Sequence, residues 1–177
     1  LGGHPDGDGT TLVLAFCHIS TTQPIEIIET EYPLTVERFE VVPDSAGAGR
    51  HRGGPAFVRE YRALDDFRLG LRSGGYKFGS WGVDGGEGPA LAGCTLQPDT
   101  DEAEAMPALF VRQMKAGDVV QVVFAGGGGL GDPHERDAAL VAEDVKNGIY
   151  TQEFAERTFG RATAAAQDLS RASGMEA

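Results

Sequence analysis

The chain has 177 residues, of which 41% are hydrophobic and 24% charged, as expected for a soluble globular protein large enough to bury a core. Its 15 basic and 27 acidic side chains give a net charge of −12, which argues against nucleic acid or an anionic membrane as the partner. The longest apolar run is too short to span a bilayer, and no secretory signal opens the sequence.

Glycine is the unusual residue. Its 26 occurrences are about twice the usual share of ~7%, which predicts many tight turns and few long helices. The glycines gather in three fields, at residues 44–54, 73–93 and 125–131. The sequence also begins at Leu1 in a glycine-rich stretch, so we expect it to be the inside of a longer protein, or a processed or trimmed piece of one.

The first elements follow from the apolar pattern. Residues 1–10 are expected to form a loop, because they hold several glycines and a proline. Residues 11–17 form a continuous apolar run, which predicts a buried strand. Residues 25–29 fit either a short strand or a helical turn.

Residues 32–42 alternate like a strand with one slip. Leu34 and Val36 fall on one face, whereas Phe39 and Val41 fall on the other. A bulge near residues 37–38 would bring all four to the same face, because one extra residue reverses the facing of a strand.

Further strands are expected at residues 57–62 and 67–72, which are predicted to pair as a β-hairpin, and at residues 109–111 and 119–124. The field at residues 73–93 is interpreted as an Ω-like loop held by Trp81, the largest side chain in it.

Helical patterns occur only near the C-terminus. Asp137 is a suitable N-cap for a helix over residues 138–146, and Thr151 for a second helix that ends before Gly160. Residues 161–177 could form another helix or a loose tail. The predicted fold class is therefore α+β, mainly β: a glycine-rich antiparallel scaffold at residues 1–133, and a C-terminal helical hairpin within residues 134–177 packed on it as one structural unit.

The field at residues 44–54 combines glycines with cationic side chains. Such glycines mark backbone with positive φ or places where the main chain approaches another group closely. Arg50 and Arg52 could bind an anionic ligand bidentately. Ion pairs that fix the loop to an acidic neighbour, such as Glu37 or Asp44, are the favoured alternative.

Other motifs give weaker signals. The glycines at 126–131 lack the Lys-Ser or Lys-Thr ending of a phosphate loop and lie well before the next helix, so a structural turn is favoured. The four histidines show no metal-ligand spacing. Cys17 and Cys94 show no zinc pattern or disulfide framework, so buried reduced thiols and a cytoplasmic location are expected. These patterns alone predict a soluble β-rich domain of unknown partner.

A succession of short motifs carries the interpretation further. Their order resembles the C-terminal part of the hydantoinase B/5-oxoprolinase family, over roughly residues 2–159. The motifs are Pro24-Ile25-Glu26, Glu31-Tyr32-Pro33-Leu34, Val36-Glu37-Arg38, the loop at 43–54, Val58-Arg59-Glu60-Tyr61, Trp81-Gly82, Gly131-Asp132-Pro133, Glu135-Arg136-Asp137 and Asp144-Val145.

The resemblance implies part of an ATP-dependent hydrolase that cleaves a C–N bond of a lactam or imide ring. It also implies a hydantoinase A-like partner that carries ATP and Mg, and a divalent metal such as Zn or Mn in the N-terminal part of the B-like component. That component is about three times longer than this chain in the family, so the implied partners are the A-like subunit and the remainder of the B-like component, in a hetero-oligomer. A subunit of an acetone- or acetophenone-type ketone carboxylase and a non-catalytic assembly module are the alternatives.

No catalytic residue or metal ligand is carried over to this chain, and the chain alone is expected to be inactive. The candidate substrate-binding residues are Thr21, Thr22, Asp44, Arg50 and Arg52. Two departures bear on the substrate: residues 18–23 lack the asparagine usual in the family, and Gly79-Ser80 stands where members tend to have proline. If these runs line the substrate site, either the substrate differs from hydantoin or this chain is a diverged subunit.

Overall fold

The computed structural model describes residues 1–11 and 23–160. Cys17, Thr21, Thr22, the predicted strand at 11–17 beyond its first residue, and the C-terminal segment 161–177 lie outside the described residues. In chain order, the elements are α1 (Ile25–Glu31), β1 (Leu34–Val41), β2 (Phe57–Ala63), β3 (Phe67–Arg72), β4 (Gly93–Leu96), β5 (Glu104–Ala105), β6 (Leu109–Met114), β7 (Val119–Phe124), the 3-10 helix η1 (Pro133–Glu135), α2 (Ala138–Lys146) and α3 (Gln152–Phe159).

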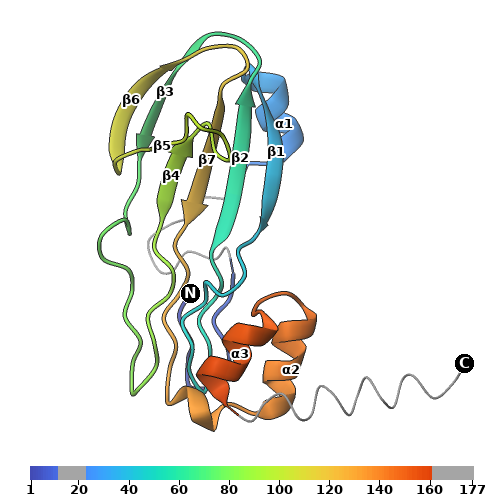
Figure 1. Cartoon of the computed structure of the whole chain (residues 1–177), viewed down its shortest axis with the longest axis vertical. Coiled ribbons are helices and arrows are strands. Elements are labelled where there is room, and N and C mark those ends of the chain that lie inside the picture. The colour runs from blue at the N-terminus through green and yellow to red at the C-terminus, as the bar shows by residue number, and fades with distance from the viewer. Residues whose placement is uncertain (12–22, 161–177) are drawn as a thin grey trace, which may run out of the picture.

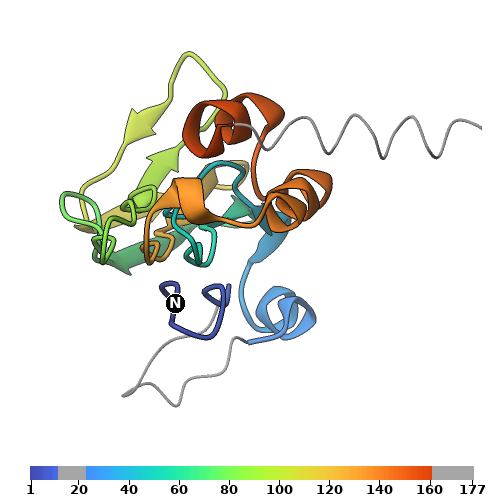
Figure 2. The same ribbon diagram turned by 90° about the horizontal axis from the view of Figure 1, so that it is seen from below.

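These elements form a mixed α+β unit, which confirms the predicted fold class. A five-stranded sheet and a two-stranded ribbon occupy one end of the molecule, and α2 and α3 occupy the other (Figure 1). Extended glycine-rich segments connect the two ends. Seen from below, α2 and α3 lie on one side of the sheet, and α1 lies on the other together with the N-terminal residues (Figure 2). None of the described helices is long and apolar enough to cross a membrane.

The sheet has the order β1-β2-β7-β4-β5, and its neighbouring strands are antiparallel. The predicted hairpin between β2 and β3 is wrong, because β2 pairs with β1 and β7 whereas β3 pairs with β6. The chain instead crosses from the sheet to a second layer. There Phe67, Leu69 and Leu71 of β3 pack against the core that includes Ala63, Val120 and Val122 of the sheet. If β2 and β3 formed a hairpin in one sheet, their apolar faces would lie next to each other on the same surface. Neither face would then cover the other.

The predicted bulge in β1 is confirmed. Val36 lies opposite Tyr61 but Arg38 lies opposite Glu60, so the register shifts at residue 37. This places all four apolar residues of β1 opposite β2 residues that share one face, which we call the apolar face of the sheet. The ambiguous residues 25–29 belong to α1, a short helix that starts after Pro24 and buries Ile28.

Both predicted helices of the C-terminal hairpin are confirmed with their caps. The Asp137 carboxylate accepts a hydrogen bond from the amide of Ala139, and the Thr151 hydroxyl accepts one from the amide of Phe154. The helices pack on the glycine-rich loop through a small core, which consists of Ala46, Ala48, Val141, Tyr150, Ala155 and Phe159.

The glycine fields form a bundle of extended segments joined by main-chain hydrogen bonds. Gly47 donates to the carbonyl of Gly127, and Gly127 donates to the carbonyl of Gly54. A Cβ on Gly53 would lie 1.8 Å from the Gly127 oxygen, and one on Gly129 would lie 1.9 Å from the Ala48 oxygen. None of the five glycines just named has a positive φ, whereas Gly75, Gly85 and Gly131 elsewhere in the fields do. Close approach of backbones, rather than positive φ, is therefore the reason for glycine here.

The loop at residues 73–93 joins this bundle through its main chain. Glu87 donates to the carbonyl of Ala48, and Val83 donates to the carbonyl of Gly129. Trp81 is 81% exposed, so the prediction that it anchors the loop is wrong. Main-chain hydrogen bonds between extended segments hold this loop in place without a large buried side chain. The single tryptophan in the loop was therefore not a sign of an anchor.

Candidate functional site

Asp44, at the start of the glycine-rich loop, binds the beginning of α3. Its carboxylate accepts hydrogen bonds from the Thr151 amide at 2.6 Å and from the Thr151 hydroxyl at 2.7 Å. Its own amide donates to the carbonyl of Ile149. Asp44 has a φ of 58°, a conformation that aspartate adopts more readily than most residues. Both carboxylate oxygens are thus occupied by contacts that position a helix.

Arg52 belongs to a buried network of two arginines and two aspartates. Its Nε donates to Asp144 at 2.8 Å. Arg136, whose side chain is fully buried, donates to Asp144 and to Asp8, each at 2.7 Å. The four charges balance within the network. The predicted anchoring of the loop by an ion pair thus fits Arg52, but the partners are Asp144 and Asp8 instead of Glu37 or Asp44.

Two members of the network, Asp8 and Arg136, are held in their charged forms by their partners. Burial opposes ionisation of Asp8, but the hydrogen bond from Arg136 and the charges of Arg136 and Arg52 outweigh it and lower the pKa of this carboxyl. Burial likewise opposes the charge on Arg136, but Asp8 and Asp144 outweigh it and raise the pKa of the guanidinium. Because α2 supplies Asp144 and the loop supplies Arg52, the network ties the C-terminal helices to the glycine bundle.

Arg50 is the cation of the loop that stays open to solvent. Its side chain is 50% exposed and lies 3.8 Å from Glu135, which is itself exposed. The structure therefore brings Arg52 and Asp44 into contacts within the chain and leaves Arg50 accessible. Thr21 and Thr22 lie outside the described residues. None of these contacts tests whether the predicted residues bind a substrate, and that assignment stays a prediction.

The next question is whether the described residues could bind a metal ion or supply a reactive thiol. Within residues 1–11 and 23–160, no three carboxylate, imidazole or thiol groups come together in a way that could hold a metal ion. Cys94 is buried as predicted, and burial raises the pKa of its thiol to about 11. Because a thiolate is the reactive form, Cys94 is not suited to act as a nucleophile at neutral pH.

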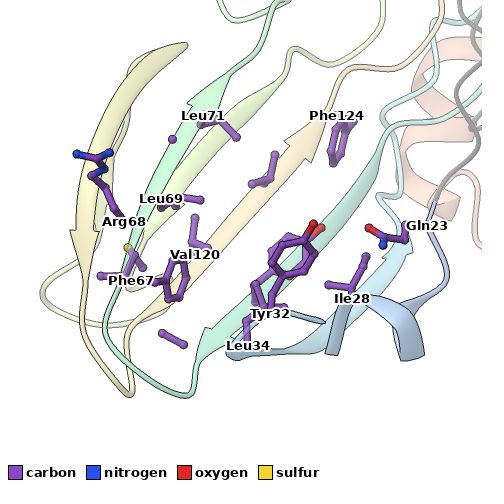
Figure 3. Close-up of a pocket in the computed structure, with 15 residues that line it drawn as sticks. Gln23, Ile28, Tyr32, Leu34, Phe67, Arg68, Leu69, Leu71, Val120 and Phe124 are labelled. Carbon is purple, nitrogen blue, oxygen red and sulfur yellow. The ribbon is translucent and has the colours of Figure 1, made fainter. Parts of the chain in front are cut away.

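An apolar cleft of about 460 Å³ opens between the sheet, the ribbon and α1 (Figure 3). In Figure 3, Phe67, Leu69 and Leu71 come from the ribbon, and Val120 and Phe124 from β7. On the other side of the cleft lie Ile28, Tyr32 and Leu34, with Gln23 next to them at one end. This lining can hold an apolar body; its described members include no carboxylate or imidazole, and its ionisable side chains are Arg68, Tyr32 and Tyr61.

A second cavity, of about 590 Å³, lies where the sheet meets the glycine bundle. Gln23 and Phe124 line both hollows, so the second continues the first. The ring of Phe57 stacks on that of Phe124 with a centroid distance of 4.3 Å. Arg59 of β2 is the only ionisable side chain among the described residues that line this cavity.

Arg59 is only 9% exposed, and its guanidinium lies 4.3 Å from the centroid of the Phe39 ring. Its Nε has no hydrogen-bond partner in the described part of the chain. We did not predict Arg59 as a site residue, although it lies in the motif Val58-Arg59-Glu60-Tyr61. The alternation of β2 was the available signal, because it puts Arg59 on the same face as Phe57 and Tyr61.

Comparisons with known proteins agree on one family. The model of the family described as Hydantoinase B/oxoprolinase matches residues 1–133. The B-type component of a putative D-/L-hydantoinase from Pseudomonas sp. (strain NS671) is 32% identical over 161 residues, which are 90% of this chain and 27% of that protein. The chain spans only 22% to 27% of the length of three curated relatives that it matches.

Two solved structures share the fold. The ATP-dependent caprolactamase from Pseudomonas jessenii aligns with a TM-score of 0.66 and 26% identity, over 82% of this chain and 28% of that one. Acetone carboxylase in its nucleotide-free form aligns with a TM-score of 0.75 and 22% identity, over 96% of this chain and 29% of that one. At that lower identity the likeness to acetone carboxylase concerns the fold alone.

Proposed function

Because the chain belongs to the hydantoinase B/oxoprolinase family, we propose that it is part of an ATP-dependent cyclic amide hydrolase. The assembly would open the C–N bond of a lactam or imide ring together with an ATPase-type A component. The observation that carries this proposal is the 32% identity to the B-type component of a putative hydantoinase over 90% of the chain. The caprolactamase structure, at 26% identity, supports the same reaction class.

We assign this chain a scaffolding and binding role within that reaction. The apolar cleft would hold the ring of the amide, and the exposed guanidinium of Arg50 would be free to meet an anionic group at the edge of the assembly. Asp44 and Arg52 would act by holding the loop and α3 in place, because their side chains are already bound within the chain. Thr21 and Thr22 remain proposed substrate contacts.

The cofactors would lie elsewhere in the assembly. ATP and Mg would bind the A-like component, and a divalent metal such as Zn or Mn would bind the remainder of the B-like component. The chemistry that ATP supplies when bound there is phosphorylation of the amide oxygen, which activates the ring carbon for attack by water. The described residues of this chain do not fit a metal site, so we derive no metal-dependent step from them.

Two other roles are weighed against this one. A subunit of an ATP-dependent ketone carboxylase is the second candidate, because the acetone carboxylase alpha subunit of Xanthobacter autotrophicus is 25% identical over 77% of this chain. A structural and assembly module is supported by the loop itself, where Asp44 and Arg52 make contacts within the chain. We rank the hydrolase first because the closer sequence relatives are named for amide substrates.

Purification of the native complex that contains this chain tests the proposal. Its partners would be identified by mass spectrometry. It would then be supplied with ATP and either hydantoin, caprolactam or 5-oxoproline, with omission of ATP as the control. We expect a ring-opened product together with ADP, and no product from the isolated chain. ATP-dependent fixation of labelled bicarbonate into a ketone without ring opening would favour the carboxylase, and ring opening by the isolated chain would contradict the assembly.

A further inference from the structure

Arg59 carries a buried charge that the described structure does not neutralise. The two other deeply placed arginines, Arg52 and Arg136, each face a carboxylate at 2.8 Å or less. No carboxylate within residues 1–11 and 23–160 forms an ion pair with Arg59. Its guanidinium touches the face of Phe39, and such a cation–π contact is worth far less than a buried charge costs.

None of the ion pairs between described residues supplies a counter-charge for Arg59. Segment 12–22 contains no aspartate or glutamate, so it cannot supply one. The acidic side chains beyond residue 160 are Asp168 and Glu176. A buried arginine is stable only when a partner satisfies its charge and its donors. An anion that enters the cavity beside Arg59 would supply the missing charge.

The shape of the cavity indicates what kind of anion fits. Because Phe39 lies 4.3 Å from the central carbon of the guanidinium and Nε is enclosed by protein, an anion in the cavity would meet the edge formed by the two terminal NH₂ groups. A planar carboxylate matches this edge with two parallel hydrogen bonds. The stacked rings of Phe57 and Phe124 offer an apolar wall for the rest of the ligand. The volume of about 590 Å³ is in the range of pockets that hold small molecules.

We propose that Arg59 is a carboxylate-binding residue and that its cavity is an anion site. The carboxylate could belong to a small molecule or to a side chain of the remaining part of the assembly, and the chemistry at Arg59 is the same in both cases. The proposal rests on the burial and the missing partner of Arg59, and it does not require the reaction proposed above. A complex that fails to open rings can still show this site by binding.

The experiment uses the complete complex with Arg59→Met, which removes the charge and keeps a long side chain, and Arg59→Lys, which keeps the charge without the planar fork. Arg62→Met is the matched control: it lies on the same strand, faces the other side and pairs with Glu37 at the surface. The probes are 5-oxoproline and 2-pyrrolidinone, two γ-lactams that differ only in the carboxylate. Binding is followed by calorimetry and by the melting temperature.

For a small-molecule carboxylate, 5-oxoproline binds the wild-type complex at least about tenfold more tightly than 2-pyrrolidinone does. Arg59→Met then weakens binding by about tenfold or more, Arg59→Lys by less, and the ligand-free Arg59→Met complex melts no lower than wild type because an unpaired charge has been removed. For a protein carboxylate, neither probe binds, and Arg59→Met lowers the melting temperature by several degrees while Arg59→Lys restores part of it.

Two results would overturn the proposal. In the first, Arg59→Met neither lowers the melting temperature nor changes the binding of either probe. In the second, the loss of stability in Arg59→Met disappears in a complex whose chain lacks residues 161–177, which would identify the tail as the source of the anion. The control Arg62→Met should leave both measurements unchanged.

Discussion

Asp144→Asn removes one charge from the buried network without changing the volume of the side chain. Asp144 is 6% exposed and accepts hydrogen bonds from Arg52 at 2.8 Å and from Arg136 at 2.7 Å. The asparagine oxygen could still accept from Arg52, but its NH₂ group would then face a donor of Arg136. Asp8 would remain as the single carboxylate for two buried guanidinium groups.

Breaking a buried ion pair by removing one partner typically costs about 3–5 kcal/mol, because the other charge is left uncompensated. We expect a loss of that size, since the Arg136 side chain is fully buried and cannot turn to water. A domain of this size is stabilised by only about 5–15 kcal/mol. The variant should therefore lose a large fraction of its stability. Local unfolding should increase most where α2 and α3 pack on the glycine bundle.

Urea unfolding at pH 7, followed by far-UV circular dichroism, measures the loss. Hydrogen exchange of the α2 and α3 amides locates it. Glu143→Gln is the matched control, because it removes an exposed charge from the neighbouring position of the same helix and should change stability by no more than about 0.5 kcal/mol. If Asp144→Asn costs less than about 1 kcal/mol, which an exposed pair would give, the network does not fix the helices.

The same network predicts an acid dependence. The pKa of Asp8 is lowered from its ordinary value of 3.8, so its contribution is complete above that pH and is lost as the pH falls through 3.8 towards the lower value of the folded state. The difference in unfolding free energy between wild type and Asp8→Asn should be constant near neutral pH and shrink in acid. A difference that grows in acid would contradict the assigned direction of the shift.

Three further outcomes are expected. Gly53→Ala should prevent folding or lower the unfolding free energy by more than about 3 kcal/mol, because its Cβ would lie 1.8 Å from a backbone oxygen. Gly70→Ala is the control, because its Cβ meets nothing within 4 Å. In the same denaturation assay it should be neutral or slightly stabilising. Trp81→Ala should leave the unfolding free energy within about 0.5 kcal/mol of wild type, and a larger loss would restore its role as an anchor. In a Cys17→Ser background, Cys94 should react with iodoacetamide only on unfolding, and fast alkylation of the native protein would show that it is not buried.

The features that sequence reasoning predicted correctly are set by neighbouring residues. The bulge in β1 follows from a change of facing within eight residues, and the caps Asp137 and Thr151 lie directly before the helices that they start. The pairing of β3 with β6 was missed because its partner lies about forty residues away, and nothing in the local pattern distinguishes a hairpin from a crossover to a second layer. The four-residue strand β4 was missed for a simpler reason: it is too short to show a period.

Arg52 and Arg59 show why a sequence motif does not predict whether an arginine is paired within the chain. Arg52 stood in a glycine-rich loop and invited an assignment as an anion binder, yet its charge is balanced by Asp144 and Asp8 from distant parts of the chain. Arg59 stood in an ordinary strand, yet it is buried without a carboxylate from the described residues. Whether an arginine lies near glycines in the sequence predicts neither of these results. The pairing of a buried arginine depends on which distant elements bring a carboxylate next to it. Besides the exposed Arg50 of the glycine-rich loop, the group proposed to meet an outside anion is therefore Arg59 on β2, at the end of the apolar face.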